Sequence, residues 1–563
     1  MPSFEFDRDD FCELVGKHYG ISELQGRLPM MGIPDTEVLE GGDIFKVEVA
    51  PNRPDMLCVE GLARAFASFE RIKTGLRSYS AEPSDLELYV DPSVKDVRPY
   101  ICCAVVENVS LSDDAIVSLF NVQEKLHTTH CRDRRKGSIG VYDASGLEFP
   151  LQYRAVDLDE VKFVPLEETV EMTPAEILTE TPKGAAYAHL VEAKAPLLTD
   201  KNGRVLSFPP IINSDDTKVT EKTNTVIIDV TGLDLDTASQ ALNIIVCALA
   251  DRGGLIREIT VRYPYAVNEK KVHKNPDLAV KQMTLPLDYV NKRTGESLTA
   301  DQVKEHLECM GFGCTTKKTG EPVVSIPPYS TDILHMIDFV EDIMISFGFE
   351  NVTPELPNLA TVAQEDPLET ITRRLTYLLV GFGAQELMTY ILTSPDVNFT
   401  KMSLPVDLAS VAVMENPQTN RFTMCRSWMA PSIMEALSQN TGEGYPQRVF
   451  EIGDCVALDS STDTGTRDDR ILCYTEVDAK TGWNEIKGIL EALAIHLEGF
   501  EFSLETSEHP SFIPGRVAKI MVNGQEQGIL GEIHPQVLRN WGLSVPVSLL
   551  ELKIGFLLQE APE

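Results

Sequence analysis

The chain has 563 residues, of which 43% are hydrophobic and 24% are charged, and its 50 basic and 86 acidic side chains give a formal net charge of -36. This composition excludes an intrinsically disordered chain, and the length exceeds what one hydrophobic core supports, so we expect about three to four domains. The negative charge opposes broad wrapping of a nucleic-acid backbone by this chain alone, so any such contact must be local or shared with a partner.

Two features of the sequence bear on location and on metal content. No stretch approaches about 18 uninterrupted apolar residues, and the amino terminus lacks the basic-then-apolar order of an export signal, which predicts a soluble, cytoplasmic protein. The eleven cysteines include no C-x-x-C pair and the ten histidines no H-x-x-x-H pair. We therefore expect reduced, mostly buried thiols rather than a zinc site.

The first segment ends at about residue 80 and contains a strand, a turn and a helix. The strand ends near Val49, and the apolar face of Val59–Phe69 predicts the helix. The turn between them holds two prolines together with Arg53 and Asp55. These two charged residues form either a functional pair or, as is usual for Asn, Pro and Asp in turns, a lock on the turn.

A second segment, about 92–265, carries the only dense basic patch of this acidic sequence, directly after a predicted helix over about 113–124. The patch consists of His127, His130, Arg132, Arg134, Arg135 and Lys136. Clusters this short are usually solvated loops, but this one is also a candidate for contact with phosphate groups.

The same segment ends in a strand followed by a helix. β-Branched residues over Thr225–Val230 predict the strand, and an apolar face starting at about Asp236 predicts the helix. Asp229 and Thr231 then lie at the carboxyl end of the strand, where pockets of α/β units open. The alternative is that Asp229 caps the following turn and Thr231 is an ordinary residue at a strand end.

A basic stretch, 268–277, predicts a linker into a third segment of about 278–356. This segment combines a helix over Ala300–Met310 with a hairpin-like turn around 317–320. Its last helix has one apolar stripe and, on another face, Asp338, Glu341 and Asp342 at spacings i, i+3 and i+4, with Asp332 near the helix start. Such a run is either a solvated acidic face or a set of hard oxygen ligands for magnesium.

The last segment begins at about residue 359 and alternates helices and strands. Pro431 lies in the first turn of a predicted helix, and a strand over 448–452, closed by Gly453, follows it. An acidic loop at 457–470 and further strands predict an antiparallel sheet with helices beside it.

Several motifs of the chain resemble the phenylalanyl-tRNA synthetase beta subunit of the archaeal and eukaryotic type. These motifs are NRPDMLCVEGLAR, CRSWMAPSIMEAL, RVFEIG, GILGEIHPQVLRNWGL and PVSLLEL. The resemblance implies an α+β multidomain chain with an amino-terminal α/β domain (1–85), an editing domain (86–267), a winged-helix-like magnesium domain (268–358) and a class II synthetase-like antiparallel sheet domain (359–563).

The resemblance also implies two sites. An editing pocket would contain Asp229 and Thr231, with Ser207 and Leu198 less firmly aligned. It would hydrolyse tyrosine wrongly attached to the phenylalanine tRNA, because a pocket shaped for phenylalanine cannot strongly reject a ring that adds a hydroxyl. The family pattern D-x(5)-D-x(2)-E-[DE] falls on four carboxylates as ligands for Mg²⁺: Asp332, Asp338, Glu341 and Asp342.

The last domain departs from a working class II synthetase. It contains no G-x-G-x-x-R string whose arginine would hold ATP phosphates, so we expect an inactive copy that packs against a partner. The resemblance implies an assembly of two alpha and two beta subunits that attaches phenylalanine to its tRNA using ATP, with the synthetic site in the alpha subunit. The alternatives are a free-standing editing hydrolase and a non-catalytic assembly scaffold.

Overall fold

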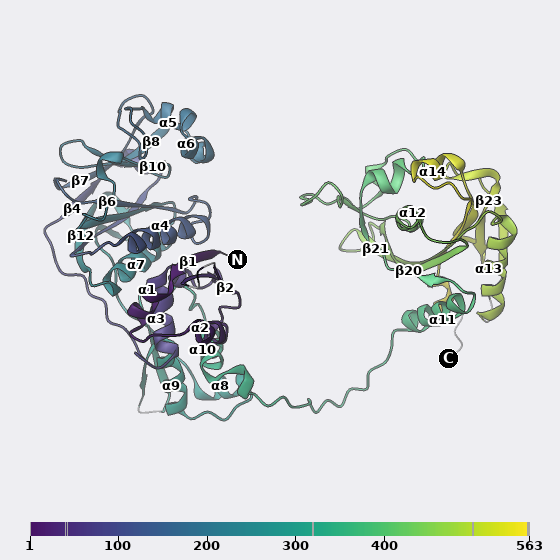
Figure 1. The fold of residues 1–563 in the computed structure, drawn as a ribbon, viewed down its shortest axis with the longest axis horizontal. Coiled ribbons are helices and arrows are strands. Elements are labelled where there is room, and N and C mark those ends of the chain that lie inside the picture. The colour runs from purple at the N-terminus through teal and green to yellow at the C-terminus, as the bar shows by residue number, and fades with distance from the viewer. Residues whose placement is uncertain (1, 40, 42, 318–319, 498–499, 560–563) are drawn as a thin grey trace. The chain divides into compact units, whose positions relative to one another are not determined.

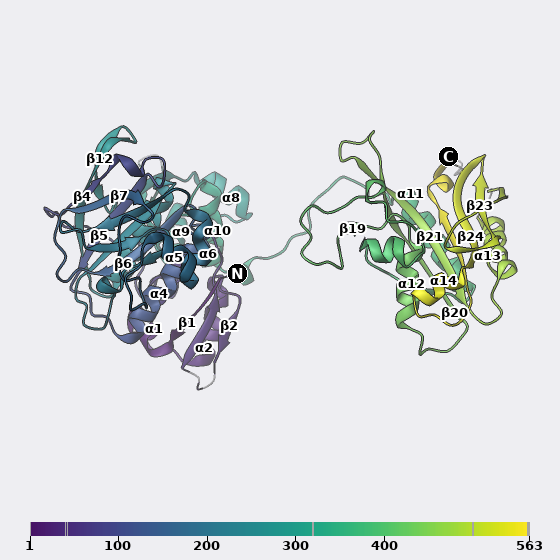
Figure 2. The same ribbon diagram turned by 90° about the horizontal axis from the view of Figure 1, so that it is seen from above.

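The computed structural model describes residues 2–39, 41, 43–317, 320–497 and 500–559. The chain divides into two compact units, Met1–Leu356 and Pro357–Glu563, which are described separately below. Mixed sheets and helices in both units confirm the prediction of a multidomain chain that contains helices and strands (Figures 1 and 2). No helix in the described residues is both long and apolar enough to cross a lipid bilayer.

The first segment of unit 1 forms a small antiparallel sheet, in the order β1-β3-β2, with helices beside it. The predicted helix over Val59–Phe69 is confirmed as α3, and the turn before it carries Arg53. The elements are β1 (Ser3–Asp7), α1 (Arg8–Val15), α2 (Ile21–Arg27), β2 (Thr36–Val38), β3 (Ile44–Glu48) and α3 (Val59–Phe69).

The second segment builds a large mixed sheet in the order β10-β9-β8-β7-β4-β12-β5-β11-β6, to which β13 adds beside β12. Its elements are β4 (Glu87–Val90), β5 (Tyr100–Glu107), α4 (Asp113–Thr128), β6 (Gly137–Asp143), β7 (Leu151–Asp157), α5 (Pro174–Glu180), α6 (Pro182–Tyr187), β8 (Lys194–Thr199), β9 (Val205–Phe208), β10 (Ile212–Asn213), β11 (Val226–Gly232), α7 (Leu235–Asp251), β12 (Leu255–Val267) and β13 (Lys270–Asn275).

Strand periodicity assigns the two faces of this sheet. Along β11, Val226, Ile228 and Val230 belong to the core shared with α4, α7 and the first segment, whereas Ile227 belongs to the core on the opposite face. Figure 1 shows α4 and α7 on one side of the strands. Asp229 and Thr231 alternate in step with Ile227, so they lie on the face away from α7.

The predicted linker at 268–277 is wrong, because most of it forms β13. Asn268 and Glu269 take positive φ angles of 44° and 66°, which turn the chain back so that β13 pairs with β12. The large sheet therefore extends to Asn275. The third segment then follows with a sheet in the order β14-β16-β15 and three helices.

The elements of the third segment are β14 (Lys281–Thr284), α8 (Leu287–Thr294), α9 (Ala300–Cys309), β15 (Gly313–Thr316), β16 (Pro322–Ile326) and α10 (Met336–Phe347). Strands β15 and β16 form the expected antiparallel pair, but residues 318–319 of the predicted turn lie outside the described residues. Buried Phe339, Val340 and Ile343 fix α10 in the core of this segment.

Unit 2 contains a sheet in the order β17-β20-β21-β25-β24-β23-β22, antiparallel except for the β17–β20 pair. Helices α11 and α13 belong to one hydrophobic core of this sheet, and α12 and α14 to the other. The elements are α11 (Pro367–Gly381), β17 (Gln385–Glu386), β18 (Leu392–Thr393), β19 (Met424–Cys425), α12 (Ala430–Gln439), β20 (Gln447–Leu458), β21 (Thr466–Val477), α13 (Trp483–His496), β22 (Phe502–Thr506), β23 (Phe512–Val522), β24 (Gln525–Ile533), α14 (Pro535–Asn540) and β25 (Val547–Lys553).

The prediction that Gly453 closes a strand is wrong, because β20 continues through Gly453 to Leu458 along its pairing with β21. The glycine instead leaves room for a side chain: a Cβ at this position would lie 2.8 Å from Nη2 of Arg426. The predicted acidic loop is correspondingly shorter, since β20 ends at Leu458 and β21 begins at Thr466.

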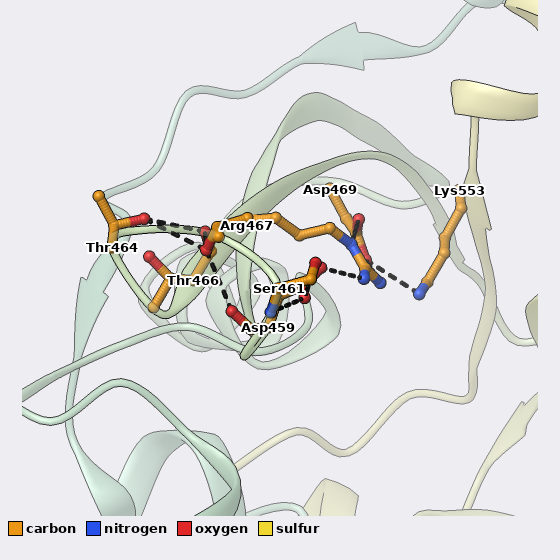
Figure 3. A network of polar contacts seen from close by, with 8 residues as sticks. Asp459, Ser461, Thr464, Thr466, Arg467, Asp469 and Lys553 are labelled. Carbon is orange, nitrogen blue, oxygen red and sulfur yellow. Dashed lines mark hydrogen bonds and ion pairs between the residues drawn. The ribbon is translucent and has the colours of Figure 1, made fainter.

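A network of polar contacts holds the end of this hairpin (Figure 3). Asp459 accepts a 2.9 Å hydrogen bond from the backbone N–H of Ser461 and a 3.1 Å contact from Arg467. Arg467 also donates to Asp469 at 2.8 Å, and Lys553 of β25 reaches Asp469 at 3.0 Å. Asp459 and Asp469 are therefore paired with cations on the same sheet.

Candidate functional site

A cavity of about 460 Å³ lies between α4 and the strands β6, β9 and β11 of the large mixed sheet. The face of the sheet away from α7 forms one wall, and the edge strand β6 brings α4 beside the opening. Its lining side chains include Asp229, Tyr142, Ser207, Glu124, His127 and Arg134. We call this space the sheet-edge cavity.

Asp229 is 1% exposed, and its Oδ1 accepts a hydrogen bond from the Tyr142 hydroxyl. Tyr142 reaches Asp229 across Gly140, which is the residue paired with Asp229 on β6. A Cβ at Gly140 would lie 1.7 Å from the Tyr142 hydroxyl oxygen and 2.5 Å from Asp229 Oδ1. The absence of a side chain at Gly140 therefore makes this contact possible.

Asp229 does not lie at the carboxyl end of its strand, contrary to the sequence prediction. Strand β11 continues to Gly232, and Asp229 is paired with Cys103 of β5 on one side and Gly140 of β6 on the other. Both pairings are antiparallel, so the rule for pockets of parallel α/β sheets does not apply. The cavity opens over the face of the sheet, where alternation alone directs the side chain of Asp229.

Burial raises the pKa of Asp229 to about 7, while the Tyr142 hydroxyl and the Arg98 guanidinium act in the opposite direction. Burial also raises the pKa of Tyr142 well above its usual range, so the phenol stays protonated and donates. At neutral pH the Asp229 carboxyl is therefore close to its midpoint between the acid and the carboxylate.

Thr231 lies behind Asp229 and does not line the cavity. It is fully buried, and its hydroxyl accepts a 2.9 Å hydrogen bond from Arg98 Nε and lies 3.1 Å from the Ser138 hydroxyl. Arg98 also donates to the backbone carbonyl of Thr231 at 2.9 Å. Thr231 thus fixes the cation whose charge favours the ionised form of Asp229.

Ser207 and Leu198 pair with each other on β9 and β8, but only Ser207 lines the cavity. The Ser207 hydroxyl is buried and makes no hydrogen bond of regular geometry with another described residue, although it lies close enough to Tyr142 to act on its phenol. Leu198 belongs to the apolar cluster that also contains Tyr142. The structure therefore brings Asp229 and Ser207 to one cavity and places Thr231 and Leu198 behind its wall, and the editing role of all four residues stays a prediction.

The basic patch divides into buried and exposed members. His127 Nε2 accepts a 2.8 Å hydrogen bond from the Ile139 N–H, and burial lowers the pKa of this histidine to about 4, so it is neutral. Arg134 is buried and donates to the carbonyls of Pro210 and Ile211 at 3.1 and 2.9 Å. These two residues shape the cavity wall; among the others, Arg132 and Arg135 are exposed to solvent.

Sequence reasoning missed Tyr142, Gly140 and Arg98 as parts of this site. Gly140 and Tyr142 have the i, i+2 spacing that places both on one face of a strand, which is a signal available from the sequence. The pairing of β6 with β11 joins residues 87 positions apart, as in the Tyr142–Asp229 contact, and no local pattern predicts that register.

The four predicted magnesium ligands are not gathered at one point. Asp338 Oδ2 accepts 2.8 Å hydrogen bonds from the backbone N–H groups of Leu334 and His335, so this carboxylate caps the start of α10. Glu341 is exposed. Among the residues that the structure describes, no three His, Cys, Asp or Glu side chains lie close enough to hold one metal ion.

Asp342 and Asp332 instead share the electrostatic field of Arg53. Asp342 is 9% exposed and makes no hydrogen bond or ion pair with another described residue, and burial raises its pKa to about 7. Arg53 forms a two-pronged contact with Asp55, both distances being 2.9 Å. Its charge also opposes the rise in the pKa of Asp332 and Asp342. The unpartnered Asp342 beside Asp332 fits a hard cation in part, but Arg53 already supplies positive charge there.

The interior of unit 2 has a buried carboxylate of a different kind. Glu551 Oε2 accepts hydrogen bonds of 3.1 and 2.9 Å from the backbone N–H groups of Met429 and Ala430, at the start of α12. Arg426, 2% exposed, pairs with Glu451 at 2.9 Å and donates to Thr389 at 2.8 Å. These charged groups therefore bind one another or polar groups of neighbouring elements within the unit.

Comparisons with known proteins agree with the motifs. Residues 352–554 match the family model described as the phenylalanyl tRNA synthetase beta chain CLM domain, and residues 283–349 match the tRNA synthetase B5 domain. A crystal structure of an N-terminal fragment of the phenylalanyl-tRNA synthetase beta subunit from Pyrococcus horikoshii is 37% identical and superimposes with a TM-score of 0.59, covering 62% of this chain and 99% of that one.

Full-length relatives are similar over almost the whole chain. The phenylalanine–tRNA ligase beta subunit of Pyrococcus furiosus is 40% identical over 559 residues, which cover 98% of this chain and 99% of the relative. The beta subunit of Methanocella arvoryzae is 38% identical over 562 residues, which cover 99% and 100%. On this evidence of identity over nearly the full length, the chain belongs to the phenylalanine–tRNA ligase beta subunit family.

Proposed function

We propose that this chain is the beta subunit of a cytoplasmic phenylalanine–tRNA ligase, which attaches phenylalanine to its tRNA with ATP through an active site in a partner alpha subunit. Identity to named beta subunits over nearly the whole length supports this function. The purified chain should not activate phenylalanine by itself, and activity should appear when the alpha subunit is added. Formation of aminoacyl-adenylate by the isolated chain would refute the proposal.

The interior of unit 2 explains why this class II-like domain would be an inactive copy. Arg426 and Glu551 are buried and bind groups within the domain, so neither is left to hold ATP or an adenylate. The same unit exposes large apolar side chains: Tyr377, Met388 and Tyr390 are 70%, 95% and 75% exposed. Such exposure supports a partner surface, and we propose an assembly of two alpha and two beta subunits.

We further propose that the sheet-edge cavity is an editing site that hydrolyses tyrosine wrongly attached to the phenylalanine tRNA. The observation that supports it is the pair of Asp229 and Ser207 in one cavity, a carboxylate near its midpoint and a hydroxyl without a partner. These groups can form hydrogen bonds with a phenol hydroxyl. A phenyl ring offers no hydroxyl, so one oxygen of Asp229 and the Ser207 hydroxyl would stay buried without a hydrogen bond. A positioned water and the terminal hydroxyl of the tRNA would carry out the hydrolysis.

Asp229→Ala tests the editing site in the complete alpha–beta complex. Charging with phenylalanine should stay near normal, and deacylation of tyrosyl-tRNA should slow by about 10- to 100-fold, the range expected for loss of a hydrogen bond to a charged group. The control is Asp157→Ala, an exposed acid of β7 outside the cavity lining, which should change neither rate. Unchanged deacylation by Asp229→Ala would remove this cavity from the proposed function.

The magnesium prediction remains a proposal, resting on Asp332 and Asp342. Their oxygens would hold Mg²⁺ together with water or a partner, and the ion would offset the repulsion between the acids. Asp332→Asn with Asp342→Asn should abolish any rise in melting temperature on adding Mg²⁺. An identical melting curve of the unaltered protein with and without Mg²⁺ would favour Arg53 as the resident cation.

A further inference from the structure

The polar wall of the sheet-edge cavity contains a hydroxyl whose chemistry matches that of the proposed substrate. Tyr142 is 1% exposed and donates its phenol O–H to Asp229 Oδ1. The other carboxylate oxygen, Oδ2, has no hydrogen-bond partner among the described residues. A carboxylate with one oxygen occupied and the other open can accept one further O–H donor.

The contact is built into the backbone of the sheet. Gly140 and Tyr142 share one face of β6, and the missing side chain of Gly140 lets the Tyr142 hydroxyl lie over the position paired with Asp229. Any larger residue at 140 would meet the hydroxyl, because a Cβ there would lie at 1.7 Å from it. Both strands are buried, so the hydrogen bond between the phenol and the carboxyl is shielded by the sheet on every side except that of the cavity.

Four groups face Asp229 from the elements packed around it. Tyr142 comes from β6, Cys103 from β5, Tyr153 from β7 and Arg98 from the segment before β5. Only Tyr142 donates a hydrogen bond to the carboxyl, and Arg98 acts through its charge. The Tyr142 hydroxyl is therefore the group that both orients the carboxyl and favours its ionised form.

We propose that Tyr142 is a positioning residue whose hydrogen bond orients Asp229 and favours its carboxylate form, so that Asp229 accepts a hydrogen bond from the phenol of a tyrosyl ester. This inference rests on the proposed editing function and deepens it. Binding of tyrosine adds a second O–H donor to a carboxylate that Tyr142 has already stabilised. A phenylalanyl ester offers no donor and leaves the acceptor unpaired, so the site discriminates against the correct product.

The test is Tyr142→Phe in the complete alpha–beta complex, which removes one oxygen and keeps the ring. Deacylation of tyrosyl-tRNA is measured from pH 6 to 8.5 after subtraction of the uncatalysed rate. Loss of the donor should move the half-maximal pH upward by about one unit, so that the rate falls about fivefold at pH 7 and returns close to normal at pH 8.5. Charging with phenylalanine should be unchanged.

Tyr263→Phe is the matched control. Tyr263 is also buried in this sheet, and its hydroxyl bonds to the backbone of Ile101 instead of lining the cavity. This variant should keep the normal pH profile, and an equal shift in both variants would overturn the proposal. A normal profile for Tyr142→Phe would also overturn it, as would loss of deacylation at every pH, which would indicate direct contact between Tyr142 and the substrate.

Asp229→Ala distinguishes failure of the positioning role of Tyr142 from failure of the editing function of the cavity. If Asp229→Ala slows deacylation as expected and Tyr142→Phe leaves the pH profile normal, only the positioning role fails. If neither variant changes deacylation, the editing function of the cavity fails with it.

Discussion

Asp229 in unit 1 and Glu551 in unit 2 are both buried carboxyls on strands that are paired on both sides, and burial raises the pKa of each to about 7. Their surroundings differ. Asp229 lines a cavity and has one oxygen without a partner, whereas Glu551 accepts two backbone N–H groups at the start of α12. A raised pKa therefore does not by itself identify a functional site. The carboxyl must also have an oxygen that is free to accept a hydrogen bond and space in which a ligand can reach it.

The same contrast applies to the arginines beside the two carboxyls. Arg98 is held by Thr231 and acts on Asp229 through its charge, without forming an ion pair with it. Arg426 forms a direct ion pair with Glu451 and hydrogen bonds that close the interior of unit 2. The arrangement around Arg98 leaves the Asp229 carboxyl available to a ligand. Around Arg426 the charged groups pair with each other and stabilise the fold.

Arg426→Met tests the structural side of the comparison and should have the largest effect. It leaves Glu451 buried without its cation, which typically costs about 3–5 kcal/mol in the free energy of unfolding. The midpoint of urea denaturation, followed by a probe in unit 2, measures this loss. Arg448→Met is the control, because its pair with Glu476 is more exposed and should contribute about 1 kcal/mol or less. Equal effects of the two variants would show that Arg426 is not a structural centre.

Asp229→Asn and Glu551→Gln compare what the two carboxyls contribute to the pH dependence of the free energy of unfolding. The folded-state pKa of each is raised above its ordinary value of 3.8 or 4.5, so the folded chain holds a proton that the unfolded chain releases. The stability from this proton is fully present below about pH 4 and is lost as the pH rises through about 7. The loss amounts to at most ~4 kcal/mol for Asp229 and ~3 kcal/mol for Glu551.

Each of these amides should flatten the fall in stability between pH 4 and pH 7, as measured by urea midpoints across that range. Only Asp229→Asn should also slow deacylation of tyrosyl-tRNA. Asp157→Asn, at an exposed position, should leave the pH dependence unchanged. A comparable loss of deacylation in Glu551→Gln would contradict the distinction between Asp229, which has an oxygen free for a ligand, and Glu551, which is bound to the backbone.

Arg467→Ala, in the hairpin network of Figure 3, should have the smallest effect. Its side chain is half exposed, and its contacts with Asp459 and Asp469 lie at the surface, where ion pairs contribute about 0–1 kcal/mol. The melting temperature should fall slightly in low salt and show no difference in high salt, because salt screens exposed charges. A loss as large as that of Arg426→Met would mean that burial does not govern the difference between these pairs.

Much of the fold follows from local patterns. The helix over Val59–Phe69 follows from the 3.6-residue period of its apolar side chains, and the strand around Asp229 follows from its run of β-branched residues; the structure confirms both elements. The linker prediction for 268–277 failed because two residues with positive φ make a tight turn, and their sequence, Asn-Glu, carries no glycine to signal it. The prediction that Gly453 ends a strand failed because this glycine does not mark a turn. It makes room for Arg426 within a strand that continues.

By itself, the sequence determined the family, through motifs spread along the chain, and the order of its helices and strands, because these depend on neighbouring residues. It also pointed to Asp229. Only the tertiary structure decided that Tyr142 donates to Asp229 across Gly140, that Thr231 holds Arg98 and that Asp338 caps α10. Most of these contacts join strands far apart in the chain, and their register depends on packing of the whole sheet instead of on any local pattern.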